Sequence, residues 1–238
     1  MKVMAIITSQ PKGLWLAELT HPYWHLIERR IEVDFFSPDG GQVGYVSKSD
    51  PYAPDSTERD DLVSKGFLSD PALVEKLATT RRLESADPDQ YSAIHIVGGM
   101  GATVDLYPNE ALGRLLETFW TQGKVVAALC HGAITLANGQ IDEGTGPVSL
   151  VAGRRVTGYS VAEDRDLERQ RGSDRPLIPY YPQTVLEQAG GIYECAGLQL
   201  PHVVQDGRLL SGQNQESATD YGMRLRDMLL AGALYPAD

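Results

Sequence analysis

The stretch "VVAALCHGAITLANG", residues 125–139, changes character halfway along its length. Val125–Leu129 is a short apolar run, the pattern of a buried strand. His131–Asn138 then has helical spacing, and Gly139 suits the end of a helix. Cys130 lies at the junction, so this stretch predicts a strand-to-helix turn with a cysteine at its apex.

Similar apolar runs alternate with helical patterns along the rest of the chain. Strands are predicted over 3–8, 31–36 and 93–97, and helices over 13–30, 71–79, 109–122, 182–189 and 217–231. Strands that alternate with helices indicate βαβ units and a mainly parallel sheet with helices on both faces. The predicted fold class is therefore α/β.

The 238 residues contain no long Gly/Ser linker, so we predict a single domain over 1–238. Within it, residues 45–66 are rich in Pro, Asp and Ser and read as irregular, and 42–90 is interpreted as an irregular segment that caps the pocket. Residues 148–152 and 154–157 resemble a hairpin around Gly153.

Composition excludes several classes of protein. A net charge of −11 argues against nonspecific binding of nucleic acid, which needs a basic surface. The apolar runs are too short to cross a membrane, and the N-terminal run is too short for a signal peptide, which favours the cytoplasm. With only two cysteines, a disulfide scaffold is not expected.

Cys130 is the leading candidate for chemistry, because active sites of parallel α/β folds lie beyond the carboxyl ends of the strands. The start of a helix stabilises a thiolate, so we expect a lowered thiol pKa and a nucleophile. His131 adds an imidazole and a backbone N–H. The alternative is a buried structural cysteine, about half of the cases for a lone cysteine.

The sequence "VGGMG", residues 97–101, follows a different strand. Backbone N–H groups at Gly98 and Gly99, with those at Cys130 and His131, could form an oxyanion hole. Taken alone, the glycines are better read as a tight turn. No Gly-Lys-Ser/Thr follows, so this is not a phosphate loop.

Three acids are candidates to assist the thiol. Glu18, on the first predicted helix, could share a proton with it, although a solvated helix-face glutamate is the default reading. Glu163 or Asp164 could orient His131 as the third member of a Cys–His–acid set, or both could be ordinary acids in the first turn of a helix. Spacing leaves this choice open.

Metal binding is weakly indicated. His21 and His25 are four residues apart and could share a helix face. Pro22 lies between them and no H-E-x-x-H motif is present, so we expect no metal and no cofactor.

Several motifs together resemble the PfpI/DJ-one superfamily, which is class I glutamine-amidotransferase-like and has a flavodoxin-like three-layer α/β/α sandwich. The resemblance covers nearly the whole chain. Its most specific part is "GKVVAALCHGAITL" (123–136), which resembles the family's nucleophile elbow, supported by "FFSPDGG" (35–41) and "IHIVGGMGATVDL" (94–106). "GLWLAELTHPYWHL" (13–26), "RRVTGYSVAED" (154–164) and "LLSGQNQESA" (209–218) are similar to the branch of heat-shock-protein chaperones and glutathione-independent glyoxalase III enzymes.

By this resemblance, Cys130 is the nucleophile, His131 the base and Glu18 a protonated acid beside the thiol. The third acid falls at Asp164 or Glu163, with Asp164 preferred. The oxyanion donors would be Gly99 and the amide of His131. The branch commonly has "GGHG" where this chain has Met100, and "GQNP" where it has "GQNQ". Methionine cannot transfer a proton, so the pocket is expected to be more apolar.

The resemblance implies a cysteine-dependent lyase that converts methylglyoxal or related 2-oxoaldehydes to 2-hydroxy acids, or a deglycase-type activity, in a cytoplasmic homodimer with a role in stress response. One alternative is a cysteine hydrolase or hydratase acting on another electrophile. A second is a chaperone or redox sensor without turnover. Cys195 is interpreted as a structural thiol.

Overall fold

A computed structural model describes residues 1–142, 144 and 146–234, so the end of the predicted domain, 235–238, lies outside the described residues. A seven-stranded sheet forms the centre, in the order β10-β11-β5-β4-β1-β2-β3. The pairs are parallel except β10 with β11. The strands are β1 (Lys2–Ile6), β2 (Glu32–Ser37), β3 (Arg81–Arg82), β4 (Ala93–Ile96), β5 (Val125–Leu129), β10 (Val203–Asp206) and β11 (Leu209–Gly212).

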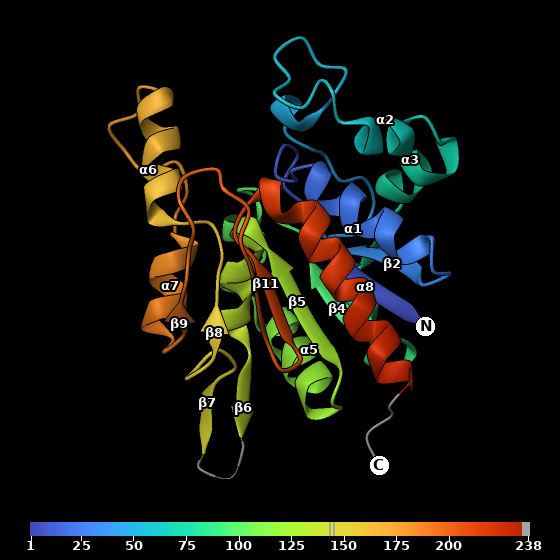
Figure 1. The fold of residues 1–238 in the computed structure, drawn as a ribbon, viewed down its shortest axis with the longest axis vertical. Coiled ribbons are helices and arrows are strands. Elements are labelled where there is room, and N and C mark those ends of the chain that lie inside the picture. The colour runs from blue at the N-terminus through green and yellow to red at the C-terminus, as the bar shows by residue number, and fades with distance from the viewer. Residues whose placement is uncertain (143, 145, 235–238) are drawn as a thin grey trace.

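Helices cover both faces of the sheet, which confirms the predicted α/β/α sandwich. Figure 1 shows α1 (Ala17–Ile27) and α8 (Ala218–Leu234) in front of the strands and α5 (Glu110–Thr121) behind them. Along β1, Val3 and Ala5 belong to the core on the α1 face, while Met4 and Ile6 belong to the core on the α5 face. Continuous apolar strands are therefore needed, since both faces of each central strand are buried.

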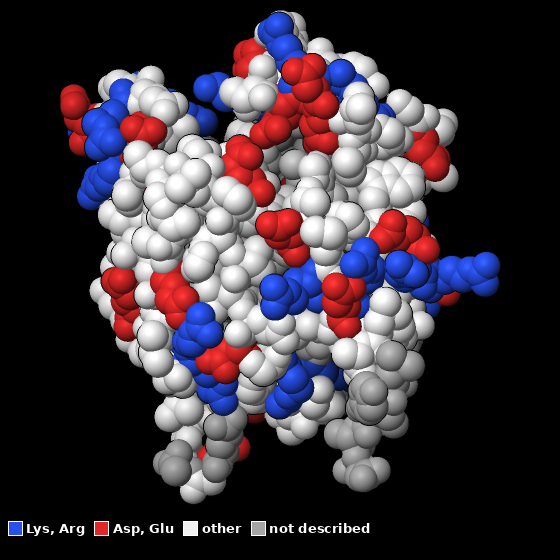
Figure 2. Space-filling view, in the orientation of Figure 1, with Lys and Arg blue, Asp and Glu red and all other residues white. Residues whose placement is uncertain are grey.

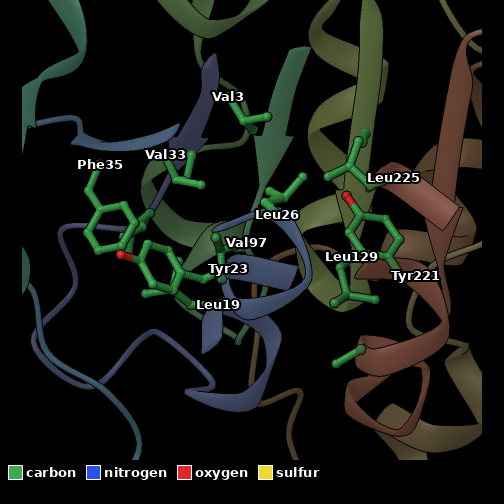
Figure 3. Packing of buried hydrophobic residues seen from close by; sticks show 14 of the residues in the cluster. Val3, Leu19, Tyr23, Leu26, Val33, Phe35, Val97, Leu129, Tyr221 and Leu225 are labelled. Carbon is green, nitrogen blue, oxygen red and sulfur yellow. The ribbon is translucent and has the colours of Figure 1, made fainter. Parts of the chain in front are cut away.

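The core under α1 also holds part of the segment 42–90. Phe67 lies on α2 (Leu62–Leu68), and its ring centroid is 5.4 Å from that of Tyr23 on α1. Phe35 of β2 lies 5.9 Å from Tyr23 (Figure 3). These edge-to-face contacts fix the segment to the sandwich through aromatic packing.

The segment 42–90 is less irregular than predicted. The helix predicted over 71–79 is confirmed as α3 (Pro71–Ala78), whereas α2 and the short 3₁₀ turns at Ser47–Ser49, Leu83–Ser85 and Pro88–Gln90 were not predicted. Asp61 and Asp70 cap the two helices by accepting hydrogen bonds from backbone N–H groups of the first turns. Asp61, within the stretch 45–66 that was read as irregular, is thus a helix cap, and within that stretch the irregular reading fails from Leu62 onward.

The predicted hairpin around Gly153 is wrong. β7 (Pro147–Ser149) pairs antiparallel with β6 (Gln140–Asp142), and β8 (Arg155–Val156) pairs in parallel with β9 (Ile192–Tyr193). The remaining elements are α4 (Ala102–Asp105), η4 (Cys130–Asn138), α6 (Val161–Gln170), α7 (Pro182–Gln188) and the 3₁₀ turn Gln215–Ser217.

Sheet register brings three strand ends together. Ile6 of β1 pairs with Ile96 of β4, and Ile96 pairs with Ala128 of β5. The residues that follow these strands therefore meet at one edge of the sheet, where the candidate site lies.

Candidate functional site

Cys130 occupies a strained turn between β5 and η4. Its φ is +57°, a left-handed conformation that a residue with a Cβ adopts at a cost of about 1–3 kcal/mol. η4 is a 3₁₀ helix, not the α-helix that the spacing suggested. It packs tightly on the end of β4, since a Cβ at Gly132 would lie 2.9 Å from the carbonyl oxygens of Ile96 and Val97.

His131 lies between the thiol and a carboxylate. Its Nδ1 is 3.4 Å from Cys130 Sγ, and its Nε2 is 3.1 Å from Asp164 Oδ1. All three side chains are buried. The carboxylate of Asp164 can only accept a hydrogen bond, so His131 Nε2 must carry the proton that it donates. The other ring nitrogen, Nδ1, is then free to accept a proton from the thiol of Cys130.

Glu163 and Asp164, which the sequence could not separate, have different partners. Ser160 caps α6 and forms a capping box with Glu163. Glu163 Oε2 accepts from Ser160 N and Oγ and Gln213 Nε2, and Oε1 accepts from Gln199 N and Asn214 Nδ2. The carboxylate of Glu163 is thus committed to holding loops together, whereas Asp164 contacts His131.

Glu18, in the first turn of α1, is completely buried beside Cys130. Neither carboxyl oxygen makes a hydrogen bond of ordinary geometry among the described residues. Burial raises the pKa of Glu18 to about 8, and the nearby Cys130 thiol and Gly98 N–H offset this only in part. Gly98 leaves room for the carboxyl, since a Cβ there would lie 2.2 Å from Glu18 Oε2.

The pKa of the Cys130 thiol is raised well above its ordinary value, so the expected lowering is wrong. Burial is the largest cause, and the neighbouring Glu18 adds to it. The backbone N–H of His131 lowers the pKa by less. A buried thiol of this kind reacts only if a base removes its proton during attack.

A pocket of about 260 Å³ opens over the thiol. Of the predicted residues, Glu18, Gly99, Met100, Cys130, His131 and Glu163 line it, while Gly98 lies behind Glu18 and Asp164 behind His131. The N–H of Gly99 has no acceptor within the part of the chain that the structure describes, as an oxyanion donor requires. The pocket is also lined by Trp15, Val46, Lys48, Thr57, Tyr159, Asp166, Leu167, Gln170, Arg171, Gln199 and Gln215.

Tyr159 is a site residue that sequence reasoning missed. Its ring stacks on His131 with 4.3 Å between centroids and 28° between planes. Its hydroxyl accepts from Gln199 Nε2 at 3.4 Å, and burial raises its pKa. The O–H stays protonated and can donate to a bound molecule. The tyrosine of "TGY" was visible in the sequence, but stacking on a histidine 28 positions away was not.

His21 and His25 make no metal site. His21 contacts Thr219 Oγ1 and Asp61, and His25 faces Glu28. Within residues 1–142, 144 and 146–234, no three His, Cys, Asp or Glu side chains gather in a way that could hold a metal. No described helix is long and apolar enough to span a membrane.

A family model described as DJ-1/PfpI family matches residues 2–227. The chain belongs to the DJ-1/PfpI family. This confirms the resemblance inferred from the elbow and the other motifs.

Several curated proteins to which this chain is similar are named as glyoxalases, including the following two. The chain is 28% identical over 222 residues to the glutathione-independent glyoxalase HSP31 of Saccharomyces cerevisiae, covering 91% of this chain and 89% of that protein. It is 26% identical over 233 residues to the probable glutathione-independent glyoxalase hsp3103 of Schizosaccharomyces pombe, covering 87% and 86%.

Solved structures share the fold. The rapid encystment protein of Francisella tularensis superposes with a TM-score of 0.84 at 26% identity, over 96% of this chain and 98% of that one. Glyoxalase III of Candida albicans superposes with a TM-score of 0.78 at 22% identity, over 96% and 97%. At 22% identity, the similarity to the Candida albicans structure shows that the two proteins share a fold.

Proposed function

We propose that this protein is a glutathione-independent glyoxalase that converts methylglyoxal or a related 2-oxoaldehyde to a 2-hydroxy acid. The observation that carries the proposal is the chain of contacts from the Cys130 thiol to His131 and on to Asp164. The thiol end of this chain lies beside the protonated Glu18 at one buried pocket. The glyoxalase names of the relatives that match most of the chain support it.

The first step would be addition of the thiol to the aldehyde. His131 Nδ1 removes the thiol proton as Sγ bonds to the aldehyde carbon, and Asp164 stabilises the resulting imidazolium. The aldehyde oxygen takes up a proton and becomes the hydroxyl of a hemithioacetal. The N–H of Gly99 and the hydroxyl of Tyr159 are placed to stabilise charge on oxygen.

The second step would move hydrogen between adjacent carbons. A base takes the proton from the sulfur-bearing carbon, and the neighbouring ketone carbon receives one, so the hemithioacetal becomes a thioester of a 2-hydroxy acid. Glu18 suits such transfers because its pKa of about 8 lets it give and take a proton near neutrality. Water then cleaves the thioester and frees Cys130, so methylglyoxal and water give lactate.

The same features bear on the alternative functions. A redox-sensing cysteine needs a low pKa and exposure, whereas burial raises the pKa of Cys130. Proteolysis needs an open cleft, whereas Val46, Lys48 and Thr57 of the segment 42–90 wall the pocket.

The test is formation of D-lactate from methylglyoxal without glutathione. Cys130→Ala should lose at least about a thousandfold in kcat/KM, because no other group can form the hemithioacetal. Cys195→Ser is the matched control: its thiol is exposed and distant from the pocket lining, so activity should stay within about twofold. Equal activity in wild type and Cys130→Ala would sink the proposal.

A further inference from the structure

The pocket over Cys130 differs in charge from floor to mouth. The floor consists of buried groups, among them Cys130, His131 and Glu18. Toward the mouth the lining includes the half-buried Lys48 and the exposed Arg171. Lys48 lies in the turn Ser47–Ser49, and Arg171 directly follows α6, so two distant segments each contribute one cation.

Neither cation is neutralised by the protein. Across the described residues, the side chains of Lys48 and Arg171 form no hydrogen bond or ion pair. Asp166, an acid that also lines the pocket, already accepts hydrogen bonds from Arg169 Nη2 at 3.0 Å and from Gln170 Nε2 at 2.7 Å. Free positive charge therefore remains at the mouth, with no acceptor assigned to it.

The surroundings make this pair distinctive. The chain carries a net charge of −11, and Glu58 and Glu216 line an adjacent hollow, where the charge of Glu58 is close enough to raise the pKa of Glu18. Figure 2 shows a notch between α6 and the segment before α2, with both basic and acidic side chains around its rim. Glu163 and Asp166 also line the pocket, but both carboxylates already accept hydrogen bonds from other residues, so the two cations that are unpaired among the described residues can attract an anion into the cleft.

Size also exceeds what a small aldehyde requires. A pocket of about 260 Å³ has the volume of several water molecules, at about 30 Å³ each. Methylglyoxal bonded to Cys130 would leave the mouth filled with water. A longer substrate could keep its oxoaldehyde at the thiol and reach the cations with its other end.

We propose that the preferred substrate is a 2-oxoaldehyde bearing a remote oxyanion, a carboxylate or a phosphate, which Lys48 and Arg171 bind from opposite walls. This rests on the proposed glyoxalase function for the reaction, but the charge preference belongs to the pocket itself. Arg171 offers a planar fork of donors and Lys48 a compact charge, and both suit an oxyanion.

The first experiment compares turnover of methylglyoxal with that of dioxovalerate, whose far end is a carboxylate, and of hydroxypyruvaldehyde phosphate. Wild type should prefer at least one anionic substrate by about tenfold or more in kcat/KM, through a lower KM. Which of the two is preferred distinguishes carboxylate from phosphate. Lys48→Gln and Arg171→Gln should each lower the preference ratio about tenfold.

The matched control is Arg175→Gln, since Arg175 is exposed on the same connection but does not line the pocket. Its preference ratio should equal that of wild type. An equal loss of preference in this control would assign the effect to overall charge and overturn the proposal.

A second experiment does not depend on turnover. Cys130 is alkylated with N-iodoacetyl-γ-aminobutyrate or with its neutral amide, and peptide mass spectrometry follows labelling separately at Cys130 and Cys195. The anionic reagent should label Cys130 faster than the neutral one, and Lys48→Gln or Arg171→Gln should remove the difference.

The two proposals can then fail separately. Charge-selective labelling without lactate formation would overturn the glyoxalase function and keep the anion site. Turnover of methylglyoxal with equal labelling by both reagents in wild type and variants would overturn the anion site alone. If neither reagent labels Cys130, the accessible pocket that the anion site needs is absent and the inference fails.

Discussion

Glu18 and Glu163 are both completely buried near Cys130, yet the two regions around them treat a carboxyl group in opposite ways. Around Glu163, two backbone N–H groups, a serine and two side-chain amides converge on both oxygens. Around Glu18, no described group makes a hydrogen bond of ordinary geometry to either oxygen. Burial alone therefore does not decide the role of an acid.

The difference teaches what makes a buried acid available for chemistry. A carboxylate that accepts several hydrogen bonds is held in one state and one position, and serves the fold. A buried carboxyl with too few donors to stabilise its charge keeps its proton. For Glu18, the effect of burial outweighs that of the Cys130 thiol and the Gly98 N–H and raises the pKa to about 8. Under the proposed function, Glu18 at the start of α1 is the acid available to exchange a proton, whereas Glu163 at the start of α6 holds loops together.

The sharpest way to break the comparison is Glu18→Gln. We expect kcat/KM for methylglyoxal to fall about a thousandfold, because a glutamine keeps the shape but cannot transfer a proton. Lactate formation measures this, and thermal unfolding should show an intact fold. Activity within threefold of wild type would mean that Glu18 transfers no proton in the reaction.

The second-largest expected effect is the change with pH in the free energy of unfolding that the raised pKa of Glu18 causes. Between the ordinary pKa of 4.5 and about 8, the unfolded chain has released the Glu18 proton while the folded protein retains it. The free energy of unfolding therefore falls as pH rises through this window. The free energy of unfolding of Glu18→Gln, taken relative to that of the parent, should therefore rise by about 3 kcal/mol from pH 5 to pH 8. This follows from about 1.4 kcal/mol per pH unit.

Urea unfolding at both pH values measures this gain, with parent and variant both carrying Cys130→Ala so that the coupled thiol is absent. Cys130→Ala alone serves as the reference at each pH. A gain that is the same at pH 5 and pH 8 would contradict the raised pKa.

Glu163→Gln tests the other half of the comparison. The new amide would turn a donor toward Gln213 or Asn214, which themselves donate to Glu163. We expect a loss of about 2 kcal/mol in the free energy of unfolding. Urea unfolding at pH 7 measures it, and an unchanged midpoint would show that these hydrogen bonds contribute nothing net.

Much of the fold was predictable because the central strands are buried on both faces. Val125–Leu129 had to be a continuous apolar run, and such a run is visible in the sequence itself. The pairing of the short strands was not predictable: β8 pairs with β9, about 37 residues away, and nothing local records that partner. A glycine at position 153 therefore suggested a hairpin that does not form.

The candidate site divides in the same way. The position of Cys130 follows from a strand end and a helix start, which are local features. The raised pKa of its thiol depends on burial by segments far away in the chain, so the local argument from the helix start had the wrong sign. The choice between Glu163 and Asp164 likewise required Gln213 and Asn214, about 50 residues beyond them.

The left-handed backbone at Cys130 makes reactivity and durability compete at one position. Glycine alone adopts this conformation without strain, so Cys130→Gly would relax the turn while removing the thiol. Replacing Cys130 with glycine would therefore stabilise the turn but remove the thiol on which the proposed function depends. The strain at this turn is thus a cost in stability that accompanies the presence of a thiol at its apex.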